Sequence, residues 1–426
     1  MSQYLKDFLR ASRGQRGVTS VCSAHAWVIE AAMIQAQEDG THLLLEATCN
    51  QVNQDGGYTG LTPAMFRDFV YDIARELSFD TSRLILGGDH LGPNPWKHLN
   101  SKTAMHQAVE MVRLYAEAGF TKIHLDASMR CADDPAILPD DVMAERAVAL
   151  CSAAETAQRE PGSGPILYII GTEVPTPGGA NHSLDVLQVT STEAVEHTVE
   201  VHRAAFHRAG LDAAWERVIG VVVQPGVEFD HDSVVNYDAA KAHHLQSFLQ
   251  HHPELVLEAH SSDYQVPCAY QELIRDGFSI LKVGPALTFA LRETLYSLAA
   301  LERELLPEAT RSNLMEIMEA VMLAHPADWQ KYYHGSAEQQ KLLRIYSYSD
   351  RIRYYWKLPE PEAAVTRLVQ NLKQSGIPET LLSQYCPRQY DEIRAGTLRS
   401  DPKAIVLSNV RAVLGPYSRA CLACTR

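Results

Sequence analysis

Eight short β-rich runs alternate with helical patterns, and this alternation constrains the fold of the chain more than any other feature. The strand candidates are 17–22, 42–47, 84–88, 122–126, 166–172, 218–224, 255–259 and 280–283. The helical patterns between them cover 26–38, 63–77, 103–118, 140–158, 192–209, 237–251 and 268–275. Eight strands that alternate with helices are the count of a (β/α)8 barrel, or TIM barrel. A doubly wound sheet is the alternative, because strand order cannot be read from a sequence.

The regular alternation ends near Phe289, and a different pattern follows. Apolar positions there have helical spacing, and no further strand candidate stands out. Pro307, Pro326 and the stretch 358–361 divide this region into separate helical pieces. We therefore expect an α/β protein with a (β/α)8 barrel catalytic domain over residues 1–299. A helical C-terminal extension, residues 300–426, is expected to pack on that barrel.

The chain is acidic, and its charge disfavours some classes of partner. It carries 38 Lys and Arg against 52 Asp and Glu, a formal net charge of −14. Nucleic acids and anionic membranes need a basic face, so we expect neither as a partner. No apolar run reaches the roughly 18 residues of a membrane span, and residues 1–17 lack an apolar signal core. We expect a cytoplasmic protein, and its eight scattered cysteines fit a reducing compartment better than a disulfide framework.

Polar side chains follow almost every predicted strand. Because the carboxyl ends of barrel strands meet at one ring, where the active sites of this fold lie, residues from distant strands share one site. Four residues of metal-ligand type come from four different strands: His90, Asp126, Glu173 and His260. Any one histidine alone fits a hydrogen-bonded core residue, but the set predicts a bound divalent metal. Imidazole with carboxylate suits Zn, Mn, Co, Ni or Fe better than Mg alone.

Two segments are candidates for binding a phosphate group. Residues 284–288 lie between the eighth strand and the next helix, where barrels often hold phosphate on backbone N–H groups; an ordinary turn is the alternative. Arg351 and Arg353 offer guanidinium forks from the extension, with structural pairing to carboxylates as the alternative. The segment 87–92 lacks the Gly-Lys-Ser/Thr end of a phosphate loop, and no G-x-G-x-x-G follows the first strand. We therefore expect neither a nucleotide P-loop nor a dinucleotide cofactor.

The sequence at these strand ends resembles a known family, the Z-type subunit of D-tagatose-1,6-bisphosphate aldolase of galactitol and N-acetylgalactosamine catabolism. Examples are Gly-Gly-Asp-His-Leu-Gly-Pro-Asn over 87–94 and Gln-Pro-Gly-Val-Glu-Phe-Asp-His over 224–231. The other segments that carry the resemblance are 21–25, 46–54, 56–60, 122–129, 171–175, 282–293 and 349–356. Members are described as non-catalytic aldolase subunits or as tagatose-6-phosphate kinases, and relatives as metal-dependent ketose 4-epimerases, including one that acts on D-tagatose 6-phosphate. The kinase description fits poorly, because the chain has neither a Walker loop nor a kinase glycine-rich loop.

The family is also distantly similar to class II aldolases, which are (β/α)8 zinc enzymes. That resemblance matches their Asp-His pair to Asp89 and His90. It matches a later metal histidine, followed by small phosphate-binding residues, to His260 and the two serines after it. Where those enzymes have a further metal histidine, this chain has Gln224. Glu173, or the side-chain carbonyl of Gln224, would have to complete the shell.

Three groups of candidate site residues result. The acid/base groups are Asp126 and Glu173, with Asp89 in reserve. The metal ligands are His90, His260, Glu173 and Gln224. The substrate-binding residues are Asn50, Gln51, Ser128, Gly226, Ser261, Ser262, Lys282, Thr288, Arg351 and Arg353.

The resemblance implies a metal-dependent epimerase that interconverts D-tagatose 6-phosphate and D-fructose 6-phosphate at C4, in galactitol or tagatose catabolism. Removal of the C4 hydroxyl proton would let the C3–C4 bond break by a retro-aldol step, and rotation of the aldehyde before recombination would give the epimer. Direct removal of the C4 hydrogen is a second route. The alternative function is a non-catalytic subunit that stabilises a D-tagatose-1,6-bisphosphate aldolase catalytic chain. The expected partners are thus a phosphorylated ketohexose, and either that aldolase chain or further copies of this one.

Overall fold

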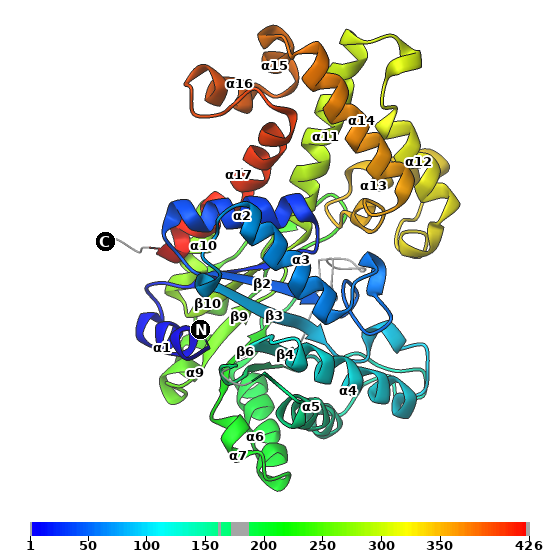
Figure 1. Ribbon diagram of the computed structural model, residues 1–426. Helices are drawn as coiled ribbons and strands as arrows, with labels where there is room; N and C mark the ends of the chain where they lie inside the picture. Colours follow the sequence, from blue (N-terminus) through cyan, green and yellow to red (C-terminus); the bar gives the residue numbers. More distant parts are fainter. Residues whose placement is uncertain (1, 161–162, 172–186, 423–426) are drawn as a thin grey trace.

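Eight parallel strands close into a barrel in the computed structural model, which describes residues 2–160, 163–171 and 187–422 (Figure 1). The strands are β1 (Val18–Cys22), β2 (Leu43–Thr48), β3 (Leu84–Leu91), β4 (Lys122–Leu125), β5 (Leu167–Ile170), β6 (Val218–Val223), β9 (Val256–Ala259) and β10 (Phe278–Val283). Each strand pairs with its neighbours in that order, and β10 pairs with β1 to complete the ring. The predicted (β/α)8 barrel is therefore confirmed at all eight strand positions, and the doubly wound sheet is excluded.

Helices connect consecutive strands around the outside of the barrel, and one more helix follows the last strand. They are α2 (Ala26–Asp39), α3 (Pro63–Glu76), α4 (Ser101–Glu117), α5 (Asp140–Thr156), α6 (Thr192–Arg208), α7 (Asp212–Trp215), α8 (Ala239–Ala242), α9 (Leu245–His251), α10 (Pro267–Arg275) and α11 (Pro285–Leu305). The start of α3 follows from its sequence, because the Thr62 hydroxyl caps the Met65 N–H and proline suits the first helical position. Within the described ranges, no helix has the length and apolar character needed to cross a membrane.

One predicted helix is wrong in its extent. The pattern over 237–251 forms two short helices, α8 and α9, with a turn at His243 and His244 between them. The His244 carbonyl accepts a hydrogen bond from the Thr192 hydroxyl at 3.2 Å, and the His244 ring bonds the Thr190 carbonyl at 2.7 Å. These contacts with the start of α6 hold the turn. A short antiparallel pair, β7 (Glu228–Phe229) and β8 (Val234–Val235), follows β6 and was not predicted.

Side chains inside the barrel form two layers, because alternate residues of a strand point inward. The first layer is apolar: Leu44, Val256 and Ile280 belong to it, and Leu5 and Leu9 of α1 (Ser2–Ser12) pack against it. Two residues further along the same three strands stand Glu46, Glu258 and Lys282. The interior therefore changes from a hydrophobic core to a charged layer toward the carboxyl ends of the strands.

The region after the barrel is helical, as predicted. Its helices are α12 (Leu314–Ala324), α13 (Ala337–Tyr346), α14 (Pro359–Ser375), α15 (Glu379–Tyr385), α16 (Pro387–Arg394) and α17 (Pro402–Leu422). The last helix, α17, returns to the barrel and packs against α2, α10 and α11 (Figure 1). Its Tyr417 hydroxyl donates to the Ser262 carbonyl at 2.7 Å. Helix α11 continues through position 299, so the division of the chain into domains there stays a prediction.

Candidate functional site

Two lysines and two glutamates form a buried floor across the middle of the barrel. The Lys122 ammonium lies 2.8 Å from the nearer oxygen of Glu46 and 2.7 Å from that of Glu258. Lys282 pairs with Glu46 and lies 3.5 Å from Glu258. Burial opposes ionisation of Glu258, but Lys122 and Lys282 outweigh it and hold the pKa of Glu258 well below its usual value. Each of the four groups thus lies beside a group of opposite charge type, which compensates the desolvation that burial imposes.

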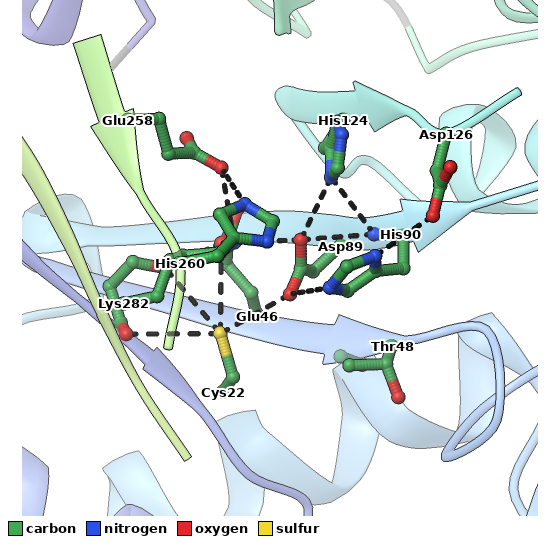
Figure 2. A network of polar contacts seen from close by, with 12 residues as sticks. Cys22, Glu46, Thr48, Asp89, His90, His124, Asp126, Glu258, His260 and Lys282 are labelled. Carbon is green, nitrogen blue, oxygen red and sulfur yellow. Dashed lines mark hydrogen bonds and ion pairs between the residues drawn. The ribbon is translucent and has the colours of Figure 1, made fainter. Parts of the chain in front are cut away.

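A cluster of one aspartate and three histidines lies above this floor (Figure 2). Its residues are Asp89 and His90 on β3, His124 on β4 and His260 just after β9. The three rings face one another, with centroids 4.8–5.2 Å apart. One ligand atom from each of the four residues lies within 4.8 Å of all the others. This approaches the roughly 3–4 Å between the ligands of a four-coordinate zinc ion, so the set is compatible with a divalent metal.

A carboxylate holds one ring nitrogen of each histidine. His90 Nδ1 lies 2.9 Å from Asp126, His124 Nδ1 lies 3.1 Å from Asp89, and His260 Nε2 lies 2.8 Å from Glu258. Among the described residues, His124 Nε2 is buried without a hydrogen-bond partner. Metal-binding histidines typically bond a carboxylate or carbonyl through one nitrogen and the ion through the other. His90 and His260 fit that pattern. For His124, the nitrogen that Asp89 holds, Nδ1, is the one on the side of the cluster in Figure 2.

His260 and Asp89 are held in the protonation state that binds a metal, whereas the surroundings of His90 favour its protonated form. Burial lowers the pKa of His260 to about 4, so this imidazole is neutral at physiological pH. Burial also disfavours the charged form of Asp89, but His90 and Lys282 outweigh it and hold the pKa of Asp89 well below its usual value. For His90 the carboxylates of Asp89 and Asp126 outweigh burial and raise the pKa. A neutral imidazole and an ionised carboxylate are the forms that bind a metal.

A second acidic group, formed by Cys22, Glu46 and Asp89, already holds a cation of the protein itself. The Lys282 ammonium pairs with Glu46 and lies 2.8 Å from Asp89. Burial raises the pKa of the Cys22 thiol well above its usual value, so it is not a thiolate. Lys282 therefore takes the place that a metal would need between these three residues.

The local backbone of β3 explains how Asp89 and His90 reach the cluster. His90 has a left-handed conformation, with φ of 49°, which is uncommon for a residue with a side chain. The register between β3 and β4 shifts there, and the His90 N–H donates to the Asp89 carboxylate at 3.0 Å. A Cβ on Gly92 would lie 1.7 Å from the Asp126 carbonyl oxygen, and one on Gly87 would lie 2.4 Å from the Glu46 carboxylate. The glycines of 87–92 thus allow close approach inside the barrel and do not form a phosphate loop.

A cavity opens above the cluster, with about 950 Å³ of space that includes its opening to solvent. Strand ends and barrel loops contribute Cys22, Ser23, Ala24, His25, Thr48, Asn50, Gln51, Tyr58, Thr59, Asp89, His90, Phe229, His260, Ser261, Asp263, Lys282, Val283, Gly284, Pro285 and Thr288 to its walls. The extension contributes Arg353, Tyr354, Trp356 and Lys357. The site is therefore built from both parts of the chain, and the turn η7 (Arg351–Tyr354) brings the extension to the mouth of the barrel.

The start of α11, a predicted phosphate position, carries a carboxylate of the protein. Asp263 accepts hydrogen bonds from the N–H groups of Gly284 at 3.0 Å and Ala286 at 2.9 Å. Burial raises the pKa of Asp263 to about 6. The Thr288 hydroxyl donates to Asp350, and the Ser262 hydroxyl donates to the Lys282 carbonyl at 2.6 Å. These groups are already hydrogen-bonded within the protein, so a phosphate at this position would have to displace Asp263.

The structure separates the two arginines that the sequence places together. Arg353 lines the cavity above the cluster, and its guanidinium donates to the carbonyls of Ser349 and Asp350. Arg351 does not line that cavity; it donates to the Asp328 carbonyl at 3.0 Å and faces a neighbouring hollow. Only Arg353 is thus placed beside the cluster.

The other predicted residues divide into three groups. Asn50, Gln51, Ser261, Lys282 and Thr288 line the cavity, together with the predicted His90, His260 and Asp89. Asp126 and Ser128 lie behind His90, where the Ser128 hydroxyl donates to Asp126 at 2.6 Å. The side-chain oxygen of Gln224 accepts from the N–H groups of Gly226 and Val227, at 2.8 and 3.1 Å. Glu173 lies outside the described residues, so its predicted roles stay predictions.

Sequence reasoning missed His124 and the floor residues Glu46, Lys122 and Glu258. His124 is two residues before Asp126, on the same side of β4 as Lys122. The signal was therefore present: charged or imidazole side chains at alternate positions inside otherwise apolar strands. Such residues need partners in the barrel interior, because an isolated buried charge is costly.

Comparison with known proteins gives a family for the chain and solved structures that resemble its fold. A family model described as D-tagatose-1,6-bisphosphate aldolase subunit GatZ/KbaZ-like matches residues 5–422. The solved structure of a probable tagatose 6 phosphate kinase from Sinorhizobium meliloti 1021 is 51% identical, with a TM-score of 0.87, over 95% of this chain and 100% of that chain. The one-glycerol complex of the fructuronate-tagaturonate epimerase UxaE from Cohnella laeviribosi is 12% identical, with a TM-score of 0.50, over 96% of this chain and 81% of that chain. The last likeness concerns the fold alone.

Proposed function

The chain belongs to the D-tagatose-1,6-bisphosphate aldolase subunit GatZ/KbaZ-like family, and from this premise we propose that it is a divalent-metal-dependent epimerase. The reaction would interconvert D-tagatose 6-phosphate and D-fructose 6-phosphate at C4. The observation that carries the proposal is the buried Asp89, His90, His124 and His260 cluster at the base of a cavity. A subunit that only supports another chain has no need of three convergent histidines, each oriented by a carboxylate.

His90, His124, His260 and Asp89 would hold the ion in this proposal. When bound, the ion would supply a Lewis acid for the carbonyl and neighbouring hydroxyl oxygens of the ketose. His124 replaces the third histidine that Gln224 does not provide, so neither Gln224 nor Glu173 is required to complete the set. Zn, Mn, Co, Ni and Fe remain the candidate ions, because imidazole with carboxylate suits them.

The protein's own groups would bind the sugar phosphate and handle its protons. Arg353 and Lys357 are the cations on the extension side of the cavity, so we assign the 6-phosphate to them. Asn50 and Gln51 on the barrel side offer amide groups to the sugar hydroxyls. Of the predicted acid/base groups, Glu173 would act on the C4 hydroxyl proton in this proposal. Asp126 lies behind His90 and would orient that ring, and Asp89 would hold the ion. The retro-aldol route is preferred over removal of the C4 hydrogen, because that hydrogen is poorly acidic.

The test uses the purified full chain. Metal is removed with a chelator, each candidate ion is restored separately, and formation of D-fructose 6-phosphate from D-tagatose 6-phosphate is measured. We expect no turnover after chelation and recovery with at least one ion. The variant His124→Gln should be inactive with every ion, whereas His106→Gln on the exposed face of α4 should match the wild type.

The competing function is a non-catalytic aldolase subunit, as the family description has it. No turnover with any of these ions, together with stabilisation of a D-tagatose-1,6-bisphosphate aldolase chain by both the wild type and His124→Gln, would favour the subunit. Turnover that survives exhaustive chelation would contradict the proposed metal dependence but would still identify the chain as an enzyme.

A further inference from the structure

A second cavity lies beside the first, between the barrel loops and the extension. The loops after β2 and β3 contribute Asn50, Asn53, Gly57, Tyr58, Asn94, Pro95, Lys97 and His98 to its walls. The extension contributes Ala327, Asp328, Lys331, Tyr332, Arg351 and Tyr354. It is slightly larger than the first cavity, with about 1080 Å³ of space that includes its opening to solvent. The epimerase proposal uses none of its cations.

The second cavity is basic in an acidic protein. Lys97, Lys331 and Arg351 line it, against the single carboxylate of Asp328, whereas the whole chain has a net charge of −14. In the described part of the chain, none of these three cations forms an ion pair with a carboxylate. Lys373, by contrast, pairs with Asp401 at 3.2 Å. Three unpaired cations around one hollow mark a place for an anion.

Arg351 gives this cavity a buried donor. Its side chain is only 3% exposed, and its guanidinium carbon lies 3.1 Å from the centre of the Tyr332 ring. Nη1 donates to the Asp328 carbonyl at 3.0 Å, but Nε has no partner among the described residues. Lys331 lies over the same ring, 5.1 Å from its centre. The aromatic ring holds two cations without neutralising them, which leaves their charge available to a ligand.

Two tyrosines stand between the two cavities. Tyr58 and Tyr354 line both, and their rings meet edge to face with centroids 4.5 Å apart. Asn50 also lines both cavities, and its side-chain oxygen accepts from Asn94 at 3.4 Å. A ligand in the second cavity would therefore contact side chains that also line the first cavity.

We propose that the second cavity is a binding site for a phosphate monoester, distinct from the position of the substrate phosphate beside Arg353. Three cations around one hollow match a dianion better than a single carboxylate group, and the planar guanidinium of Arg351 suits phosphate oxygens. The proposal does not depend on the epimerase activity. The ligand is either a separate sugar phosphate or the second phosphate of a ketose bisphosphate that spans both cavities.

The experiment measures phosphate binding with the first cavity weakened. Inorganic phosphate is titrated into Arg353→Gln at constant ionic strength, and Kd is compared after adding Lys97→Gln and Lys331→Gln. We expect the Kd for phosphate to rise roughly tenfold, because two exposed lysine ammonium groups no longer attract the anion. The matched control adds Lys102→Gln and Lys341→Gln, two exposed lysines that do not line the cavity, and should leave Kd unchanged. Equal Kd values in all three proteins would overturn the proposal.

Two further probes identify the source of the phosphate. D-fructose 6-phosphate and D-fructose 1,6-bisphosphate are titrated separately into the wild-type chain and into Lys97→Gln/Lys331→Gln. A separate sugar phosphate predicts two monophosphates bound per chain and one in the variant. A spanning ligand predicts one bisphosphate per chain, bound more weakly by the variant, with monophosphate binding unaffected. If the variant binds both probes as the wild type does, the site does not exist.

Discussion

The floor of the barrel and the cluster above it are both buried and polar, but their side chains are partnered in different ways. In the floor, Lys122 and Lys282 meet the carboxylates of Glu46 and Glu258, and each charge has an opposite charge beside it. In the cluster, carboxylates hold one nitrogen of each histidine, and His124 Nε2 is left over. Opposite charges in contact indicate a structural role, whereas three buried imidazole rings that face one another beside a carboxylate indicate a site for a ligand. Strands β4 and β9 thus supply both the support and, two residues further along, a member of the cluster.

The largest expected effect comes from breaking the floor. Lys122→Met keeps the volume of the side chain but leaves two buried carboxylates to share Lys282. Removal of one partner from a buried ion pair typically costs about 3–5 kcal/mol, and we expect a loss of that size in the free energy of unfolding. Denaturant unfolding of the metal-free protein measures it, with the exposed Lys102→Met as the control. An unchanged free energy of unfolding would mean that the floor contributes nothing to stability.

Asp350 contrasts with the carboxylates of the floor. It is buried, but among the described residues no cation forms an ion pair with it. Burial raises its pKa to about 7, although the Thr288 hydroxyl, Arg353 and Arg292 act in the opposite direction. The folded protein thus keeps a proton that the unfolded chain releases near pH 4, so the free energy of unfolding falls as pH rises from about 4 to about 7. The slope from one proton is at most about 1.4 kcal/mol for each pH unit.

The variant Asp350→Asn tests this dependence. The amide mimics the protonated carboxyl, so we expect the variant to gain stability relative to the wild type as pH rises, with the difference constant above pH about 7. Urea unfolding at a series of pH values measures the difference. If the two proteins keep a constant difference between pH 4 and 7, Asp350 does not titrate in that range.

Asp126→Asn weakens the support of the cluster and leaves the floor intact. The amide oxygen can still accept from His90 but carries no charge, so the imidazole becomes a poorer ligand. Loss of such a supporting carboxylate typically costs 10–100-fold in metal affinity, and we expect that range in a competition with a chelator. Asp134→Asn is the control, since Asp134 is also buried but pairs with Arg146, away from the cluster. Equal losses in the two variants would make the effect a general consequence of lost stability.

The smallest effect is expected at Arg353, the cation on the extension side of the cavity. Arg353→Gln should raise KM for D-tagatose 6-phosphate roughly tenfold, with little change in kcat, because uniform binding of the phosphate is lost. The KM for unphosphorylated D-tagatose should not change. Steady-state kinetics with both sugars measures this, with the exposed Arg75→Gln on α3 as the control. Parallel changes for both sugars would assign Arg353 to structure.

The fold and the centre of the site were predictable, because barrel topology brings strand ends together whatever their separation in sequence. Asp89, His90 and His260 met in one place for that reason. His124 was missed because Asp126 was chosen as the metal-ligand candidate from the same strand end. Its contacts with Asp89 and with the rings of His90 and His260 place it in the cluster.

Side-chain direction at the rim could not be predicted. Arg351 and Arg353 are two residues apart in one short helical turn, so they point to different cavities. The amide oxygen of Gln224 accepts from the N–H groups of Gly226 and Val227, and the backbone of its loop determines this direction. These directions depend on local turns, and the pattern of apolar and polar residues does not specify them.

Metal content tests the central claim most directly. The full chain and His124→Gln are loaded with zinc, dialysed, and measured by elemental analysis alongside a thermal unfolding scan. The account predicts about one zinc per wild-type chain, a substoichiometric amount in His124→Gln, and a zinc-dependent rise in Tm in the wild type alone. Stoichiometric zinc in His124→Gln, or none in the wild type, would contradict the assignment of the Asp89, His90, His124 and His260 cluster as the metal site.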